Sequence, residues 1–388
     1  MTDTCIKNSE EFQSDFIKIL ADHINKQKTS ITGLDGDVLY ECAQRHQVTP
    51  MVYYQCRDIL SQNKKAEAMY LASQVYYMKR KIAVSEIDAA LKDIPHIFMK
   101  GAVVAECYPE PSLRLMGDVD FLVPADKRDE ADKLLRDAGF AFLYKEQNEV
   151  GTWSYKKHQN TFEMHVQLMH EGMAEDKMYG YFFDVWDNVK DGQLDNNFHF
   201  LFMAAHIKEH LYDNGCGFRQ FMDIAAATLS WKDLDWDKII KTAEELGLKK
   251  FLLTLLAFNE RWFNVKSPYE GFAIDENFYK ETTDNIFRNG VFGFDNEDNY
   301  ANEAVNKIKN GENYNAISSF FRAVFLPYSN LVTMPEYSFL KGKKWLLPVA
   351  WIYRIVLKWK SRKKVKNKFF VSKETTDKRL NYLEKWGL

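Results

Sequence analysis

Patterns typical of β-strands are confined to one stretch of this sequence, about residues 94–170, and this limits the fold more than any other feature. The runs that read as strands are short and apolar: HIFMKG at 96–101, GDVDFLV at 117–123, FAFLY at 140–144, TWSYKK at 152–157 and TFEMHVQL at 161–168. Helical segments separate the first three runs, and the last two read as a hairpin that turns at residues 158–160. The stretch therefore predicts a small mixed β-sheet with helices packed against it.

Helical patterns dominate the chain on both sides of this stretch. They cover residues 9–27, 36–47, 50–62 and 64–92 before it, and 198–213, 218–231, 233–246 and 248–263 after it. The predicted fold class is therefore α+β, a small mixed β-sheet core flanked by helical N- and C-terminal regions. The predicted division is a helical N-terminal region at 1–92, the core at 93–175, a helical domain at 176–330, and a basic aromatic C-terminal segment with a closing helix at 331–388.

Composition and charge exclude several classes of protein. The chain has 388 residues and a net charge of −3, which argues against a dedicated duplex-DNA binder, since such proteins are normally basic. Its five cysteines are scattered without CxxC spacing, which favours reduced thiols over a disulfide framework or a zinc knuckle. The N-terminus lacks a signal-peptide pattern, and the apolar segment 345–357 is too short to span a bilayer. We therefore expect a cytoplasmic protein with no transmembrane segment.

Two aspartates, Asp118 and Asp120, stand one residue apart in the middle of the apolar run GDVDFLV. Side chains alternate along a strand, so both carboxylates belong to one face, with Cα atoms about 6.5–7 Å apart. Such a pair can hold two divalent cations about 3.5–4 Å apart. The alternative is an edge strand on which both aspartates face water, and the pair alone does not decide between the two interpretations.

A third acidic position lies on the strand TFEMHVQL. Its apolar residues alternate strictly with polar ones, so Glu163 and His165 share one face and the apolar side chains share the other. An ordinary amphipathic strand would show the same alternation. If this strand belongs to the same small sheet, however, Glu163 can complete a site for a hard cation, because magnesium prefers oxygen ligands.

Lys100 and Gly101 stand where the first strand gives way to a helix, in FMKGAVVAE. A glycine lets the backbone approach a phosphate, and the free N–H groups of a helix start favour an anion. A lysine at this place adds a positive charge for a triphosphate. Arg114 is a further candidate phosphate contact, with an ordinary surface arginine as the alternative.

These elements together resemble the layout of the nucleotidyltransferase superfamily, to which polymerase-β-like enzymes belong. The similarity is closest to the uncharacterised bacterial nucleotidyltransferase-like family, in which a KG element precedes R-x-x-x-D-x-D. Here the corresponding segments are MKGAVVAECYPEPSLRLMGDVDFLV and FEMHVQL. Segments near residue 43, at 202–226 and near residue 345 also look like parts of such proteins.

The resemblance implies Mg²⁺-dependent transfer of a nucleoside monophosphate from an NTP to an acceptor hydroxyl on a small molecule, an RNA or a protein. It makes Asp118, Asp120 and Glu163 the catalytic residues and the ligands of two Mg²⁺ ions. It also implies candidates for binding the nucleotide: Lys100, Gly101, Arg114 and His165. The chain departs from the superfamily at the junction, which is usually Gly-Gly or Gly-Ser with the serine touching phosphate and is Lys100-Gly101-Ala102 here. Two consequences stay open: weak binding of the triphosphate, or substitution of the missing hydroxyl by Lys100. The chain also has glutamate where the third acid is often aspartate.

Other features leave alternatives open. A non-catalytic nucleotide sensor or scaffold is the competing interpretation, since the junction serine is missing. The segment HIKEH at 206–210 matches the HxxEH pattern of inverted zinc peptidases, although helix packing explains it as well. Arg219 and Asp223 stand four residues apart and are expected to pair. The basic segment at 354–368 is a candidate surface for RNA or an anionic membrane, with a solvated helix end as the alternative.

Overall fold

The computed structural model divides the chain into two compact units. The first comprises Met1–Leu211 and Gly215–Phe294, and the second comprises Tyr212–Asn214 and Asp295–Leu388. The structure describes these residues: 10–146, 151–169, 176–213, 215–291, 305, 325–332, 335–340, 342–359 and 373–388. The four regions predicted from the helix and strand patterns stay a prediction.

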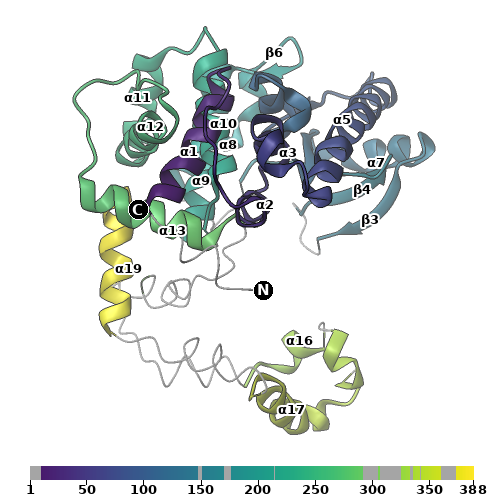
Figure 1. The fold of residues 1–388 in the computed structure, drawn as a ribbon. Helices are drawn as coiled ribbons and strands as arrows, with labels where there is room; N and C mark the ends of the chain where they lie inside the picture. Colours follow the sequence, from purple (N-terminus) through teal and green to yellow (C-terminus); the bar gives the residue numbers. More distant parts are fainter. Residues whose placement is uncertain are drawn as a thin grey trace. The chain divides into compact units, whose positions relative to one another are not determined.

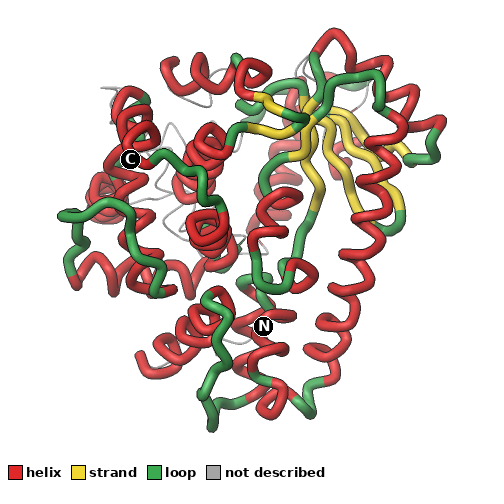
Figure 2. The backbone as a smooth tube through the Cα atoms, turned by 90° about the horizontal axis from the view of Figure 1, so that it is seen from above, coloured by secondary structure: helices red, strands yellow, loops and turns green. Residues whose placement is uncertain are grey.

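The first unit contains a five-stranded sheet that confirms the predicted α+β class (Figures 1 and 2). Its strands are β1 (Ile97–Phe98), β2 (Asp118–Leu122), β3 (Ala141–Lys145), β4 (Trp153–Lys157) and β5 (Asn160–His165). The spatial order is β1-β2-β5-β4-β3. Strands β2 and β5 run parallel, whereas every other neighbouring pair in this sheet is antiparallel. The sheet is therefore mixed, as the strand and helix patterns predict.

Each central strand has one apolar face and one polar face. Val119 and Phe121 of β2 join Phe162 and Met164 of β5 in a single buried cluster. Helices α5 (Lys64–Ala90) and α7 (Arg128–Asp137) contribute the other side of this cluster. Because side chains alternate along a strand, burying this face turns the acidic residues of β2 and β5 to the opposite face of the sheet.

Helices account for most of the rest of the first unit (Figure 1). Besides α5 and α7, they are α1 (Glu10–Ile24), α2 (Gly36–Arg45), α3 (Thr49–Gln55), α4 (Arg57–Leu60), α6 (Gly101–Val104), α8 (Asp176–Phe183), α9 (Asn196–Asp213), α10 (Phe218–Ser230), α11 (Trp236–Glu245), α12 (Lys249–Phe263) and α13 (Glu276–Asn289). Side-chain caps begin several of them; Asn63, for example, accepts a hydrogen bond from the N–H of Ala66 at the start of α5. The two short strands β6 (Val189–Lys190) and β7 (Gln193–Leu194) form a hairpin that periodicity did not predict.

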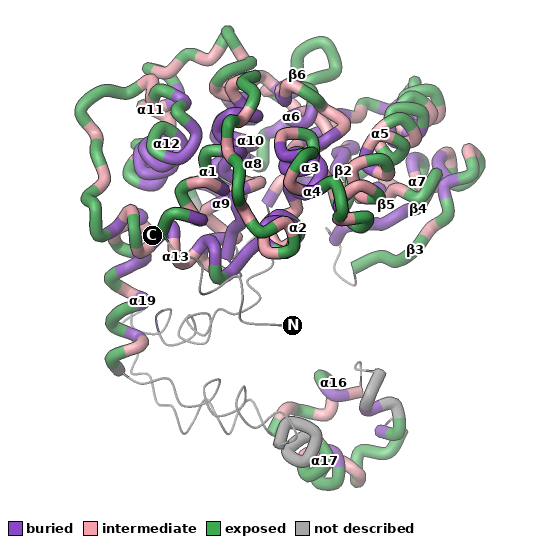
Figure 3. Tube along the Cα trace, in the orientation of Figure 1, coloured by how far each residue is buried: buried purple, intermediate pink, exposed green. Residues whose placement is uncertain are grey.

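A core rich in aromatic side chains holds the helices together. Phe218 of α10 lies 5.2 Å from Trp262 of α12 and 5.0 Å from Phe287 of α13, between ring centroids. His46, which follows α2, is fully buried beside Phe218 at 4.8 Å. Figure 3 shows how much of α10 and α12 is buried. Packing of this kind fixes α10, and α10 carries one of the side chains that anchor the strand β2.

The second unit has a small core of its own. Its described helices are α16 (Tyr328–Leu331), α17 (Leu347–Trp359) and α19 (Lys373–Trp386), with 3₁₀ turns at Pro335–Leu340 and Lys344–Leu346. Leu331, Tyr337, Leu340 and Ala350 form its buried cluster. Most of the basic segment at 354–368 lies outside the described residues, as do the side chains of 354–359, so its predicted RNA or membrane contact stays a prediction. Within the part of the chain that the structure describes, every helix is too short or too polar to cross a membrane.

Candidate active site

The parallel pairing of β2 and β5 brings acidic residues from two distant segments together. Asp120 stands directly opposite Glu163 in the register, and Asp118 stands opposite Thr161. Leu122 is opposite His165, so His165 lies one pleat beyond Glu163 on the same face. The three predicted acids therefore lie on one face of two adjacent strands.

Two of the acids and His165 converge closely enough to share one ion. In the described part of the chain, the set that does so is Asp120, Glu163 and His165, with one ligand atom from each within 4.8 Å of the others. His165 Nε2 lies 2.9 Å from Asp120 Oδ1 and 3.9 Å from Glu163 Oε2. Two carboxylates and an imidazole form a donor set that fits a divalent cation.

Asp118 occupies a different position from the other two acids. It begins β2 and is exposed to solvent, whereas Asp120 is only 7% exposed. The pKa of Asp118 is raised, first because surrounding protein displaces water from part of its carboxylate and then because Asp120 is negatively charged. Asp118 thus lies at the solvent-exposed end of the acidic face.

Asp120 and Glu163 respond oppositely to the same surroundings. Burial opposes ionisation of Asp120, but the charge of Lys100 and the hydrogen bond from His165 outweigh it, so the pKa of Asp120 is lowered. Lys100 Nζ donates to Asp120 Oδ1 at 3.0 Å. Partial burial and the charges of Asp118 and Asp120 raise the pKa of Glu163. Asp120 therefore stays ionised to lower pH than an ordinary aspartate, whereas Glu163 takes up a proton more readily than an ordinary glutamate.

Lys100 is held in an unusual backbone conformation at the junction of β1 and α6. Its φ is +49° and its ψ is −127°, a region that residues other than glycine rarely occupy. The backbone N–H of Lys100 donates to Nε2 of His199 on α9 at 2.9 Å. Burial and the charge of Lys100 lower the pKa of His199 to about 4, so this ring is neutral and able to accept. His199 was missed by sequence reasoning; a histidine inside the apolar run FHFLF was the only local signal.

Gly101 is required by its neighbour Arg114. A Cβ atom at Gly101 would lie 2.6 Å from a terminal nitrogen of Arg114. Arg114 cannot easily move, because Nε and a terminal nitrogen bind both carboxylate oxygens of Asp223 on α10, at 2.9 and 2.6 Å. The hydroxyl of Tyr108 also donates to Asp223 at 2.7 Å. Arg114 is thus buried in an ion pair, while its other terminal nitrogen faces Gly101 and donates to the carbonyl oxygen of Leu115 at 3.3 Å. Its predicted phosphate contact stays a prediction.

The expected pairing of Arg219 with Asp223 is wrong. Asp223 instead accepts from Arg114, while Arg219 donates to Gln47 Oε1 at 2.6 Å and to the carbonyl oxygen of Leu115 at 2.9 Å. Both arginines therefore fasten the segment that leads into β2. The residues four apart on α10 each have a partner from a distant part of the chain, and this overrides the local spacing.

The HIKEH segment lies on α9, the helix that also carries His199. His206 and His210 contact each other through their Nε2 atoms at 3.0 Å, and His206 Nδ1 lies 3.7 Å from Glu209. Burial, followed by the charge of Lys100, lowers the pKa of His206 to about 3. Neither histidine belongs to the three-ligand set found in the described residues. The described residues thus offer no third ligand for the zinc-peptidase interpretation. Helix α9 instead contacts the junction through the hydrogen bond between His199 and the backbone N–H of Lys100.

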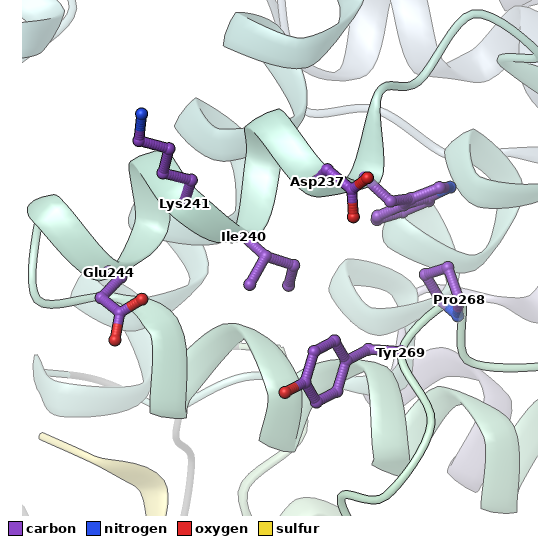
Figure 4. A pocket seen from close by; sticks show the side chains of 7 residues that line it. Asp237, Ile240, Lys241, Glu244, Pro268 and Tyr269 are labelled. Atoms are coloured by element: carbon purple, nitrogen blue, oxygen red, sulfur yellow. The ribbon is translucent and has the colours of Figure 1, made fainter.

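A separate pocket of about 180 Å³ lies between α11 and the loop that follows α12 (Figure 4). Trp236, Ile240 and Tyr269 are among its lining residues. None of the candidate site residues lines this pocket. It is therefore distinct from the acidic face of the sheet.

Comparison with known proteins gives one match. A family model described as an uncharacterised nucleotidyltransferase matches residues 32–264. That range includes the whole five-stranded sheet, the junction at Lys100 and the helices α9 and α10. No curated protein matches the chain, and no solved structure does.

Proposed function

The chain belongs to a family of uncharacterised nucleotidyltransferases, and from this premise we propose that it transfers a nucleoside monophosphate from an NTP to an acceptor hydroxyl. We further propose that the reaction needs divalent metal ions, two Mg²⁺ ions by resemblance to the superfamily. The catalytic residues of this proposal are Asp118, Asp120 and Glu163.

The observation that carries the proposal is the register of β2 and β5. It sets Asp120 against Glu163 on the polar face of the sheet, with Asp118 two residues earlier on the same face. Three carboxylates this close repel one another; Lys100 pairs with Asp120, but negative charge nearby still contributes to the raised pKa of Asp118 and of Glu163. The donor set of Asp120, Glu163 and His165 supports a metal site. Metal ions bound there would neutralise phosphate charge and acidify the acceptor hydroxyl.

The side chains around the metal site have separate roles in the proposed reaction. Asp120 is held ionised by Lys100, and it is the fixed anion of the site. Lys100 has a flexible side chain, so its ammonium group can exchange Asp120 for a phosphate oxygen of the nucleotide. Gly101 leaves room for the side chain of Arg114, and Arg114 in turn fixes the segment before β2 through its ion pair with Asp223.

The proposed chemical step is an in-line displacement. The acceptor oxygen attacks the α-phosphorus, the bond from that phosphorus to the bridging oxygen breaks, and pyrophosphate leaves with the electron pair. The proton of the acceptor hydroxyl goes to a carboxylate oxygen of Glu163, which acts as the general base of the proposal. Positioning of the two reactants and preorganised charge supply most of the acceleration.

The test is incubation of the full chain with labelled NTPs, a divalent metal salt and cell extract. We expect pyrophosphate release and a labelled acceptor. We expect Asp118→Asn, Asp120→Asn and Glu163→Gln each to lower the rate by at least about 100-fold, as loss of a catalytic group typically does. Asp126→Asn is the matched control, because Asp126 is an exposed aspartate just after the same strand.

Two results would contradict the proposal. Unchanged transfer in Asp120→Asn would remove Asp120 from the reaction. Calorimetric binding of NTP with metal but no pyrophosphate release, with any extract, would favour the non-catalytic sensor.

A further inference from the structure

His165 departs from an all-carboxylate metal site, and its surroundings suit a metal ligand. It ends β5, its side chain is 14% exposed, and its Nε2 atom faces both Asp120 and Glu163. Two ligands that bind one ion at about 2.1 Å lie roughly 3 to 4 Å apart, depending on the angle between them. The distances from Nε2 to the two carboxylates, 2.9 and 3.9 Å, fall close to this range.

The second ring nitrogen of His165 has a partner that favours metal binding at the first. Nδ1 lies 3.3 Å from the hydroxyl oxygen of Thr152, a buried residue just before β4. Thr152 is itself fixed, because its backbone N–H donates to Glu146 at 3.0 Å and its carbonyl oxygen accepts from the N–H of Glu146 at 3.1 Å. Metal-bound histidines usually donate their other N–H to an oxygen, which holds the ring and leaves the ligating nitrogen unprotonated.

Two contacts of Asp120 use the same one of its two carboxylate oxygens. Lys100 Nζ and His165 Nε2 both contact Oδ1 of Asp120, so neither of these two contacts uses Oδ2 of Asp120. In the present arrangement the short distance from Nε2 to Oδ1 is a hydrogen bond. A metal ligand at Nε2 would require the neutral tautomer with its proton on Nδ1, and that N–H would then donate a hydrogen bond to the hydroxyl oxygen of Thr152.

We propose that His165 Nε2, Asp120 and Glu163 bind a first-row transition-metal ion such as Mn²⁺ in preference to Mg²⁺. This inference rests on the proposed function, which supplies the reason for a metal. Imidazole nitrogen suits Fe²⁺, Ni²⁺, Cu²⁺ and Zn²⁺, whereas Mg²⁺ selects oxygen ligands and keeps its waters. Mn²⁺ is the weakest binder of the first-row series and binds chiefly oxygen, so it is the most demanding of these ions as a probe of the imidazole ligand. Mn²⁺ accepts both kinds of ligand in an octahedral arrangement.

The experiment adds Mn²⁺ alone to the full chain and records pulsed electron paramagnetic resonance. Nitrogen bound directly to Mn²⁺ gives a ¹⁴N modulation, which carboxylates cannot give. We expect this modulation in the native chain and its loss in His165→Asp, which still binds Mn²⁺ through oxygen. His158→Asn is the control, because His158 is an exposed histidine in the β4–β5 turn with a positive φ that asparagine tolerates.

Two further measurements sharpen the result. Displacing Mn²⁺ with Mg²⁺ is expected to need at least about a tenfold excess in the native chain, and less in His165→Asp, because ligand type sets the preference. Thr152→Val is expected to weaken Mn²⁺ binding by about 10- to 100-fold while the ¹⁴N modulation remains, the usual effect of losing the partner of a metal-bound histidine.

The outcomes separate this inference from the proposed function. Bound Mn²⁺ without ¹⁴N modulation, or modulation unchanged in His165→Asp, overturns the metal assignment even if nucleotide transfer is found. Modulation that depends on His165 supports the assignment even if the chain transfers no nucleotide.

Discussion

Replacing Arg114 by methionine tests how the site is held in place. Arg114 is 6% exposed, and its guanidinium binds both oxygens of Asp223, whose side chain is 14% exposed. Methionine has a side chain of similar length but no hydrogen-bond donor. The carboxylate of Asp223 then keeps the hydroxyl of Tyr108 as a donor but loses both donors of Arg114. Breaking one partner of a buried ion pair costs about 3–5 kcal/mol, a large share of a typical unfolding free energy of about 5–15 kcal/mol.

The assay is urea denaturation followed by tryptophan fluorescence. Of the nine tryptophans, five lie in the first unit and four in the second, so the transition that Arg114→Met shifts is the one assigned to the first unit. We expect Arg114→Met to lower the unfolding free energy by about 3–5 kcal/mol. The double variant Arg114→Met with Asp223→Leu is expected to regain much of that loss, because apolar replacement of a whole buried pair is often neutral. A decrease in unfolding free energy below about 1 kcal/mol in Arg114→Met, the level of a surface ion pair, would refute the reasoning. It would also be refuted if the decreases of Arg114→Met and Asp223→Leu added up in the double variant.

Nucleotide affinity in the same double variant decides what Arg114 does. If Arg114 only positions the segment leading into β2, affinity for NTP returns to within about twofold of the native value once the fold is restored. If the side chain touches phosphate, the affinity stays low although the fold has recovered. We expect the first result, because the ion pair already uses the guanidinium.

Two further predictions concern pH and charge. Asp120→Asn is expected to lower the denaturation midpoint at pH 7, because the lowered pKa of Asp120 means that its ionised form stabilises the fold at this pH. Glu163→Gln is expected to raise the midpoint, because the raised pKa of Glu163 means that its ionisation destabilises the fold. Shifts of the same sign would contradict this. The free energy of unfolding is also expected to fall from pH 6.5 toward pH 4. Burial lowers the pKa of His199 to about 4 in the folded chain, so in this range the unfolded chain binds the proton more readily. A single buried histidine changes the free energy of unfolding by at most about 1.4 kcal/mol per pH unit. A flat profile by urea denaturation would rule this out.

The sequence alone determined which residues share a face. Alternation along a strand placed Asp118 with Asp120 and Glu163 with His165, because successive side chains on any strand point to opposite sides. It also predicted the α+β class and the nucleotidyltransferase family, both of which are confirmed. These conclusions depend only on neighbouring residues and on short motifs, which a single sequence displays directly.

The tertiary structure decided which of these faces and side chains meet. Only the placement of β5 beside β2 sets Glu163 opposite Asp120, although β3 and β4 lie between them in the chain. The pairing of Arg114 with Asp223 and the bond from Lys100 to His199 join residues about a hundred positions apart, whereas the spacing on α10 suggested a different pair. Local pattern does not encode such contacts, because a buried charge takes whichever partner the packing of the whole chain brings within reach.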